Sequence, residues 1–222
     1  MRLVIVSILT FLLFFQCDKI GIESEIVKVI TTLDKDKIYI IYRETDSKNG
    51  LISRNYNISP SSMTHVGIGF FDKNELFKIF HIDLNQKKES QKNDIIVSSI
   101  SEFFDLKDCS VLGGEIWRYD KEFSDKEFNE IHNYIDSMFL NTNIKFDIDF
   151  DYEDSNKLYC SELVSKFLTK FSKDSYTSDL KSKKVNNIHR LYLKKDTVKY
   201  IPVDYFMTLP SFQKVYQFKS EV

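Results

Sequence analysis

Two side chains in this sequence have the types needed for nucleophilic catalysis: a cysteine at the predicted start of a helix and a histidine at the predicted start of a strand. Cys160 stands at the head of the amphipathic segment 158–171. A cysteine in a first helical turn faces unpaired backbone N–H groups and the positive end of the helix dipole, and both lower the pKa of a thiol. Cys160 is therefore a candidate nucleophile. A buried structural cysteine on a core helix is the competing interpretation.

Four histidines are available as a partner base: His65, His81, His132 and His189. His65 begins an apolar run whose glycines, Gly67 and Gly69, leave room for a substrate or an opposing backbone. His81 follows across a predicted hairpin, so the rings of His65 and His81 can hydrogen-bond on neighbouring strands. The other two histidines are expected at the surface. No H-x-x-x-H or C-x-x-C spacing is present, so the sequence predicts no metal site.

The elements that must position these residues mix strands and helices without regular alternation, which indicates an α+β fold. Capping boxes predict helices beginning at Ser99 and Ser124. Helical spacing predicts a helix over 158–171 and, with a strand as the alternative, over 22–33. Residues 44–62 and 176–187 are predicted to be loops, and 202 begins a short helix. Apolar, β-rich runs predict strands at 37–43, 65–71, 76–84, 110–119, 198–201 and 212–218, with a hairpin turn over 72–75.

The composition is that of a folded protein. The chain has 222 residues, of which 42% are hydrophobic and 14% aromatic, with a formal net charge of −2. Such a chain can bury a core and is too apolar for disorder. Its near-neutral charge gives no electrostatic reason to bind nucleic acid. Three cysteines exclude a small scaffold held by several disulfides.

The N-terminus has the pattern of an export signal. Arg2 precedes an apolar run from Leu3 to Phe15, which is too short for a spanning helix and matches the hydrophobic region of a secretory signal. Cys17 follows directly, where a lipoprotein signal ends and the cysteine takes diacylglycerol. Ordinary cleavage nearby and an uncleaved anchor are the alternatives. We therefore expect a signal peptide at 1–16, an anchor and lead-in segment at 17–36, and one domain at 37–222, exported to the cell envelope.

The order of the motifs resembles a known family. A strand at Lys37–Arg43 is followed by Thr64–Ile68 (THVGI) and, much later, by Tyr159–Val164 (YCSELV). This order resembles the YiiX/YebB-like branch of the circularly permuted NlpC-type, papain-like cysteine hydrolases, in which the histidine strand precedes the cysteine helix. Lys145–Asp147 resembles that family's approach to the cysteine, and Tyr200–Asp204 its late P-x-D segment. The resemblance covers about residues 33–218.

The resemblance implies a circularly permuted papain-like fold, an antiparallel sheet or partial barrel packed against helices, with the nucleophile at a helix N-terminus. It implies that His65 removes the proton of Cys160, that the thiolate attacks an amide or ester carbonyl, and that the backbone N–H of Cys160 donates to the oxyanion. His81 falls at the third catalytic position and would orient His65, with Glu75 and Asp83 as substitutes. Thiol hydrolases of this kind need no metal or cofactor.

Three functions remain open. The first is a cell-envelope cysteine hydrolase, an amidase or peptidase that cleaves an amide bond through a thioester, with peptidoglycan peptides as the expected substrate. The second is a lipid acyl hydrolase or acyltransferase with lecithin:retinol acyltransferase-like chemistry, and the third is a non-catalytic binding lipoprotein of the envelope. We expect a monomer that contacts the membrane only through an acylated Cys17. We also expect Cys160 to stay reduced, with Cys109 a bystander.

Overall fold

The computed structural model describes residues 24–83, 93–104, 111–172, 176, 180–185, 190 and 195–219. The predicted signal segment lies outside the described residues, as do Cys17, Cys109 and His189. Within the described ranges, none of the helices combines the length and apolar character that a membrane crossing requires.

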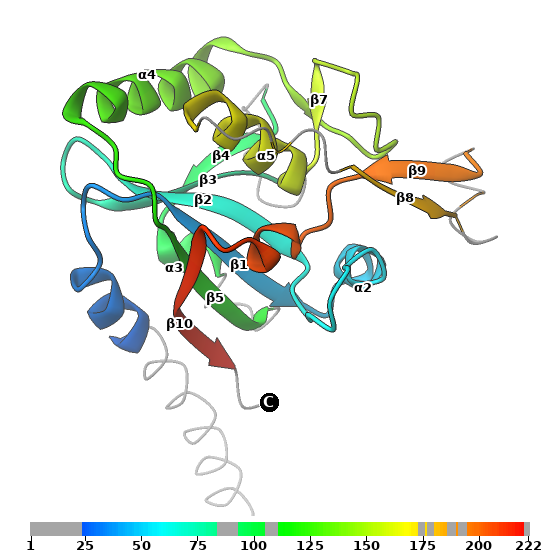
Figure 1. The fold of residues 1–222 in the computed structure, drawn as a ribbon, viewed down its shortest axis with the longest axis horizontal. Coiled ribbons are helices and arrows are strands. Elements are labelled where there is room, and N and C mark those ends of the chain that lie inside the picture. The colour runs from blue at the N-terminus through cyan, green and yellow to red at the C-terminus, as the bar shows by residue number, and fades with distance from the viewer. Residues whose placement is uncertain are drawn as a thin grey trace, which may run out of the picture.

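A six-stranded sheet in the order β10-β5-β1-β2-β3-β4 forms the centre of the fold, and every neighbouring pair is antiparallel (Figure 1). The predicted α+β class is therefore confirmed. The hairpin predicted over 72–75 joins β2 to β3. The strands are β1 (Tyr39–Thr45), β2 (His65–Phe71), β3 (Phe77–Ile82), β4 (Ile95–Ser98), β5 (Val111–Tyr119) and β10 (Phe212–Lys219).

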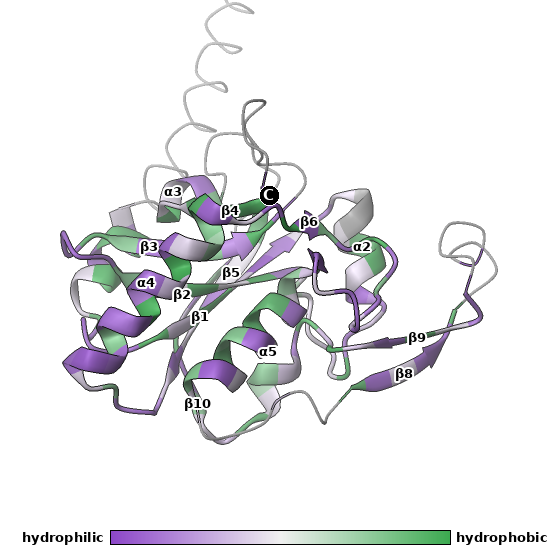
Figure 2. Cartoon of the chain, turned by 90° about the horizontal axis from the view of Figure 1, so that it is seen from above, coloured by the Kyte–Doolittle hydropathy of each residue, from purple (hydrophilic) through white to green (hydrophobic). Residues whose placement is uncertain are grey.

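Helices cover both faces of the sheet, so its central strands carry apolar residues at almost every position. Helices α4 (Asp125–Asn141) and α5 (Cys160–Phe171) pack on one face, and α3 (Ile100–Phe103) and a helix over 24–31 on the other. Successive strand residues alternate between the faces. Val66 and Ile68 pack toward α5, whereas Ile41 and Ile79 belong to the α3 side. Figure 2 shows the apolar side of α5 turned toward the sheet.

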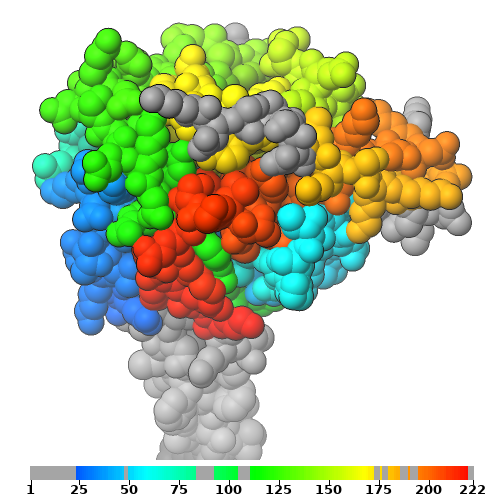
Figure 3. Space-filling view, in the orientation of Figure 1, coloured from blue at the N-terminus to red at the C-terminus, as the bar shows by residue number. Residues whose placement is uncertain are grey.

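Two small sheets complete the architecture. β6 (Lys145–Phe146) and β7 (Lys157–Leu158) are parallel and lead into α5, and β8 (Lys181–Lys184) pairs with β9 (Thr197–Tyr200) in a ribbon that projects from the body (Figure 1). A short 3-10 helix, η1 (Tyr205–Thr208), follows Pro202 as predicted. The segment between β9 and β10, orange to red in Figure 3, lies against α2 and α5 in the space-filling view. In that contact, Asp204 accepts hydrogen bonds from the backbone N–H groups of Ile58 and Ser59.

Both predicted capping boxes are present. The Ser124 hydroxyl accepts a hydrogen bond from the Glu127 N–H, while the Glu127 carboxylate accepts one from the Ser124 N–H at 2.8 Å. Ser99 and Glu102 make the same pair of bonds at the start of α3. The capping arrangement satisfies backbone donors that have no partner inside a helix.

The predicted loops are wrong in two places. Residues 44–62 contain α2 (Lys48–Arg54), whose first turn is capped where Ser47 accepts a hydrogen bond from the Gly50 N–H. A Cβ at Gly50 would lie 2.9 Å from the carbonyl oxygen of Thr45, so glycine is what lets this helix pack there. Residues 176–187 contain β8, a lysine-rich strand that forms because it pairs with β9. Tertiary pairing overrides the low strand propensity of lysine.

Candidate active site

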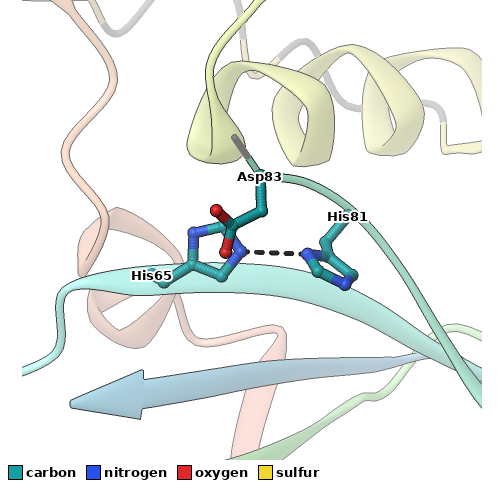
Figure 4. A group of neighbouring side chains, drawn as sticks. All are labelled: His65, His81 and Asp83. Carbon is teal, nitrogen blue, oxygen red and sulfur yellow. Dashed lines mark hydrogen bonds between the residues drawn. The ribbon is translucent and has the colours of Figure 1, made fainter. Parts of the chain in front are cut away.

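His65 and His81 lie on neighbouring strands, and their rings contact each other, as expected. Nε2 of His65 is 3.1 Å from Nδ1 of His81 (Figure 4). Nε2 of His81 is in turn 2.8 Å from Oγ of Ser98 on β4, so the three side chains form one hydrogen-bonded chain. Nδ1 of His65 makes no hydrogen bond within the described part of the protein. With Nε2 of His65 as the donor to His81, that Nδ1 carries a lone pair and is able to accept a proton.

Gly67 allows this approach of the two rings. A Cβ added at Gly67 would lie 3.0 Å from Cβ of His81 and 2.8 Å from Cγ2 of Ile79. Any larger residue would therefore push β3 away from the start of β2. The glycine that the sequence analysis linked to open space is filled by the side chains opposite it.

Both histidines are neutral at neutral pH because they are buried. Burial lowers the pKa of His65 well below its usual value, and the charge of Arg43 lowers it further. The pKa of His81 is also lowered well below its usual value, by burial first and then by His65 and Arg43. A buried imidazole loses the hydration that would stabilise its charged form.

Arg43 and Asp83 form a buried ion pair next to the histidines. Arg43 lies opposite His65 in the β1–β2 register, and its guanidinium also donates to the carbonyl of Phe103. The Asp83 carboxylate follows the end of β3, and its oxygen lies within 4.8 Å of ring nitrogens of His65 and His81. The sequence analysis named Asp83 but missed Arg43 and Ser98. An arginine ending an apolar strand was the available signal for Arg43.

Cys160 is the first residue of α5, as the sequence predicted, and its side chain is buried, with 7% exposed. Its expected low pKa is not found. Burial raises the pKa of the thiol to about 11, and this outweighs the opposing effect of the backbone N–H groups of Val66 and Ser161. The thiol is therefore protonated at neutral pH, since desolvation exceeds the stabilisation offered by the helix N-terminus.

The cysteine and the histidines approach the start of β2 from different faces of the sheet. His65 packs against the ring of Phe103 on the α3 side, with ring centroids 5.7 Å apart, whereas Cys160 belongs to the cluster on the α5 side. Among the residues that the structure describes, Sγ of Cys160 makes no hydrogen bond to either imidazole. The thiol is nevertheless close enough to feel the backbone of Val66 and the charges of Asp83 and Arg43.

The remaining candidates lie away from this cluster. Glu75 is exposed in the β2–β3 turn, where it pairs with Lys35. His132 was expected at the surface, but its ring is half-buried and Nε2 lies 2.9 Å from the carbonyl oxygen of Phe71. That contact arises because α4 packs across the end of β2.

The protein thus has a mixed α+β fold in which the antiparallel sheet carries two hydrogen-bonded histidines and α5 begins at a buried cysteine. A solved structure with a similar fold is described as the metalloprotein yiiX from Escherichia coli O157:H7. The two match with a TM-score of 0.60 and 14% sequence identity, over 85% of this chain and 100% of that chain, so the likeness is one of fold. No family model and no curated protein matches the sequence.

Proposed function

We propose that the protein is a cysteine hydrolase of circularly permuted papain-like fold that cleaves an amide bond through a thioester in the cell envelope. The observation that carries the proposal is the chain His65–His81–Ser98, which leaves Nδ1 of His65 unbonded one residue away from the Val66 amide that faces Cys160. The yiiX-like fold supports it, because the sequence resemblance names the same branch.

In this mechanism the proton moves during the attack. Both the thiol and the imidazole are neutral at rest, so Nδ1 of His65 takes the proton as Sγ of Cys160 attacks the carbonyl carbon. The backbone N–H of Cys160 donates to the oxyanion, and His81 accepts a hydrogen bond from the imidazolium. His65 then protonates the leaving amine. Water hydrolyses the thioester and restores the thiol.

The resting geometry requires one movement before that step. Nδ1 of His65 and Sγ of Cys160 must come within hydrogen-bond reach while Nε2 of His65 keeps its bond to His81. The pairing of β2 with β3 begins at Ile68 and Phe80, whereas the pairing with β1 reaches His65 itself, so the start of β2 is held by a neighbouring strand on one side only. Substrate binding at the head of α5 would supply the energy for this movement, as catalytic hydrogen bonds often tighten only in the complex.

The test is turnover of purified peptidoglycan peptides, with acylated lipids as the competing substrates. Cys160→Ala and His65→Ala should each abolish turnover, and an acyl adduct on Cys160 should be detectable by mass spectrometry. His132→Gln is the matched control, because this histidine bonds a backbone carbonyl outside the site. Turnover by Cys160→Ala at the wild-type rate would refute the proposal. Cleavage of the lipids alone would favour the lipid acyl hydrolase.

A metal site is a second candidate. Donor atoms of His65, His81 and Asp83 lie within 4.8 Å of one another, and the protein of similar fold is described as a metalloprotein. Two imidazoles and a carboxylate suit Zn²⁺, which when bound would polarise a carbonyl or activate water. Arg43 opposes a cation there, because its guanidinium pairs with Asp83. Metal analysis after dialysis against Zn²⁺ decides it: one zinc per chain, lost in His81→Gln, supports the site, and none in the wild type excludes it.

Export and lipidation belong to the same proposal. We propose that the chain is cleaved after residue 16 and that Cys17 carries the lipid, which would place the domain at a membrane surface. The mass of the mature N-terminus tests this, and an unmodified chain that starts elsewhere than Cys17 would contradict it.

A further inference from the structure

Tyr42 has a hydroxyl group with no partner. Its side chain is fully buried in the centre of β1, at 0% exposure, and within the described residues its hydroxyl makes no hydrogen bond. A buried polar group without a partner costs free energy, and such groups in folded proteins call for an explanation. Tyr42 was not among the residues that the sequence marked for chemistry.

The position of Tyr42 places this hydroxyl on the Cys160 side of the sheet. Tyr42 lies opposite Val66 on β2, and directly paired residues point to the same face. Both belong to the cluster that contains Cys160 and the inner side of α5. The backbone of Val66 also contacts the thiol. The phenol and the thiol therefore flank the same backbone segment.

The nearby carboxylates bond other donors. The Asp204 carboxylate accepts from the Ile58 N–H at 3.0 Å and from the Ser59 N–H at 2.8 Å. The Glu115 carboxylate accepts from Nε1 of Trp117 at 2.7 Å and from Nζ of Lys214 at 3.3 Å. Burial and these carboxylates raise the pKa of Tyr42 well above its usual value, so the hydroxyl keeps its proton and remains a donor.

We propose that the Tyr42 hydroxyl donates a hydrogen bond to the substrate oxyanion that forms when Cys160 attacks. This inference rests on the proposed function. As the S–C bond forms, the carbonyl π electrons move to oxygen, the thiol proton goes to His65, and Tyr42 keeps its own proton. Tyr42 and the backbone N–H of Cys160 then supply two donors. The bond from Tyr42 exists only with the oxyanion, so it stabilises the transition state rather than the bound substrate.

Tyr42→Phe tests the inference. We expect kcat/KM for the amide substrate to fall about 10²–10³-fold, mainly through kcat, as for the loss of one oxyanion donor. The melting temperature should stay the same or rise, because the variant removes an unpaired hydroxyl. Alkylation of Cys160 by iodoacetamide should keep its wild-type rate, since displacement at a saturated carbon forms no oxyanion. Tyr119→Phe is the matched control, because that buried hydroxyl bonds Tyr176 and should affect stability but not kcat.

The outcomes separate this inference from the proposed function. If Cys160→Ala abolishes turnover and Tyr42→Phe stays within two-fold of wild type, the oxyanion role is wrong and the hydrolase stands. If Tyr42→Phe slows alkylation as much as turnover, Tyr42 positions the thiol and the oxyanion role is also wrong. If Cys160→Ala keeps its turnover, the hydrolase itself fails.

Discussion

Cys160 and His65 are both uncharged in the resting structure, and one physical cause acts on both. Burial raises the pKa of the thiol to about 11 and lowers the pKa of the imidazole well below its usual value. Each group keeps the form that needs less hydration. The pair is thus not a preformed thiolate and imidazolium, and in the proposed mechanism the proton leaves Cys160 during the attack.

The neutral thiol predicts slow alkylation at neutral pH. Because only the thiolate reacts, the rate for Cys160 with iodoacetamide should rise about tenfold per pH unit from pH 7 toward the pKa of about 11. Peptide-resolved mass spectrometry measures this rate separately from those of the other two cysteines. A fast rate that does not change between pH 6 and 8 would instead indicate a stable thiolate.

Some residues of the site could be predicted from the sequence, and others could not. His65 and Cys160 stand out because each begins an apolar element. Ser98, Arg43 and Tyr42 acquire their roles only from strand pairing: Ser98 meets His81 through the β3–β4 ladder, and Arg43 lies opposite His65. Register depends on contacts between distant segments, which periodicity within one strand does not specify.

At the scale of elements, the site depends on how β2 and β3 pack. The hairpin was predictable from two β-rich runs joined by four polar residues, and α4 from its capping box. β4 was not predicted, although it completes the histidine chain through Ser98. The α2 helix was hidden by its polar, glycine-containing sequence. Local signals therefore located the elements that bear the histidines, but not those that support them.

Gly67→Ala should separate β2 from β3 at the histidines. The added methyl group would lie within 3.0 Å of Ile79 and His81, so the strands must shift. We expect a loss of about 1–3 kcal/mol in the free energy of unfolding, as for overpacking elsewhere. The shift should also break the His65–His81 contact and lower kcat. Chemical denaturation and steady-state kinetics measure the two effects.

Gly69→Ala is the matched control for that variant. Its methyl group would lie 2.6 Å from Phe77 and 2.9 Å from Ile41, which is equally crowded but away from the histidines. A similar loss of stability with kcat retained is expected. If both variants keep full activity despite equal destabilisation, the contact between the two rings has no role in turnover.

At the scale of the whole molecule, the site lies where two cores meet. One cluster packs under α4 and α5, the other against α3 and the helix over 24–31, and the sheet separates them. Arg43, His65, His81 and Asp83 are each at most 9% exposed at this boundary. Buried ionisable groups reduce the stability of a domain. The protein thus retains a costly polar cluster that a purely structural sheet would not need.

This cluster predicts how stability depends on pH. The folded-state pKa values of His65 and His81 lie below those of the unfolded chain, so below about pH 6.5 the unfolded chain binds protons that the native protein does not. Acidification therefore destabilises the fold. Glu162 acts in the opposite sense. Burial raises its pKa from 4.5 to about 7. The contribution of Glu162 to the free energy of unfolding is therefore fully present below pH 4.5 and is lost as the pH rises through 7.

We therefore expect the free energy of unfolding to fall between pH 6.5 and pH 5, since two histidines outweigh one glutamate over that range. Denaturant titrations at several pH values measure this fall for the wild type and for two variants, Glu162→Gln and His81→Gln. The fall should be steeper in Glu162→Gln, which lacks the opposing contribution, and shallower in His81→Gln, which lacks one of the two protons taken up on unfolding. Equal slopes in all three would mean that neither His81 nor Glu162 has a pKa shifted by folding, and burial would then not be what keeps the imidazole neutral.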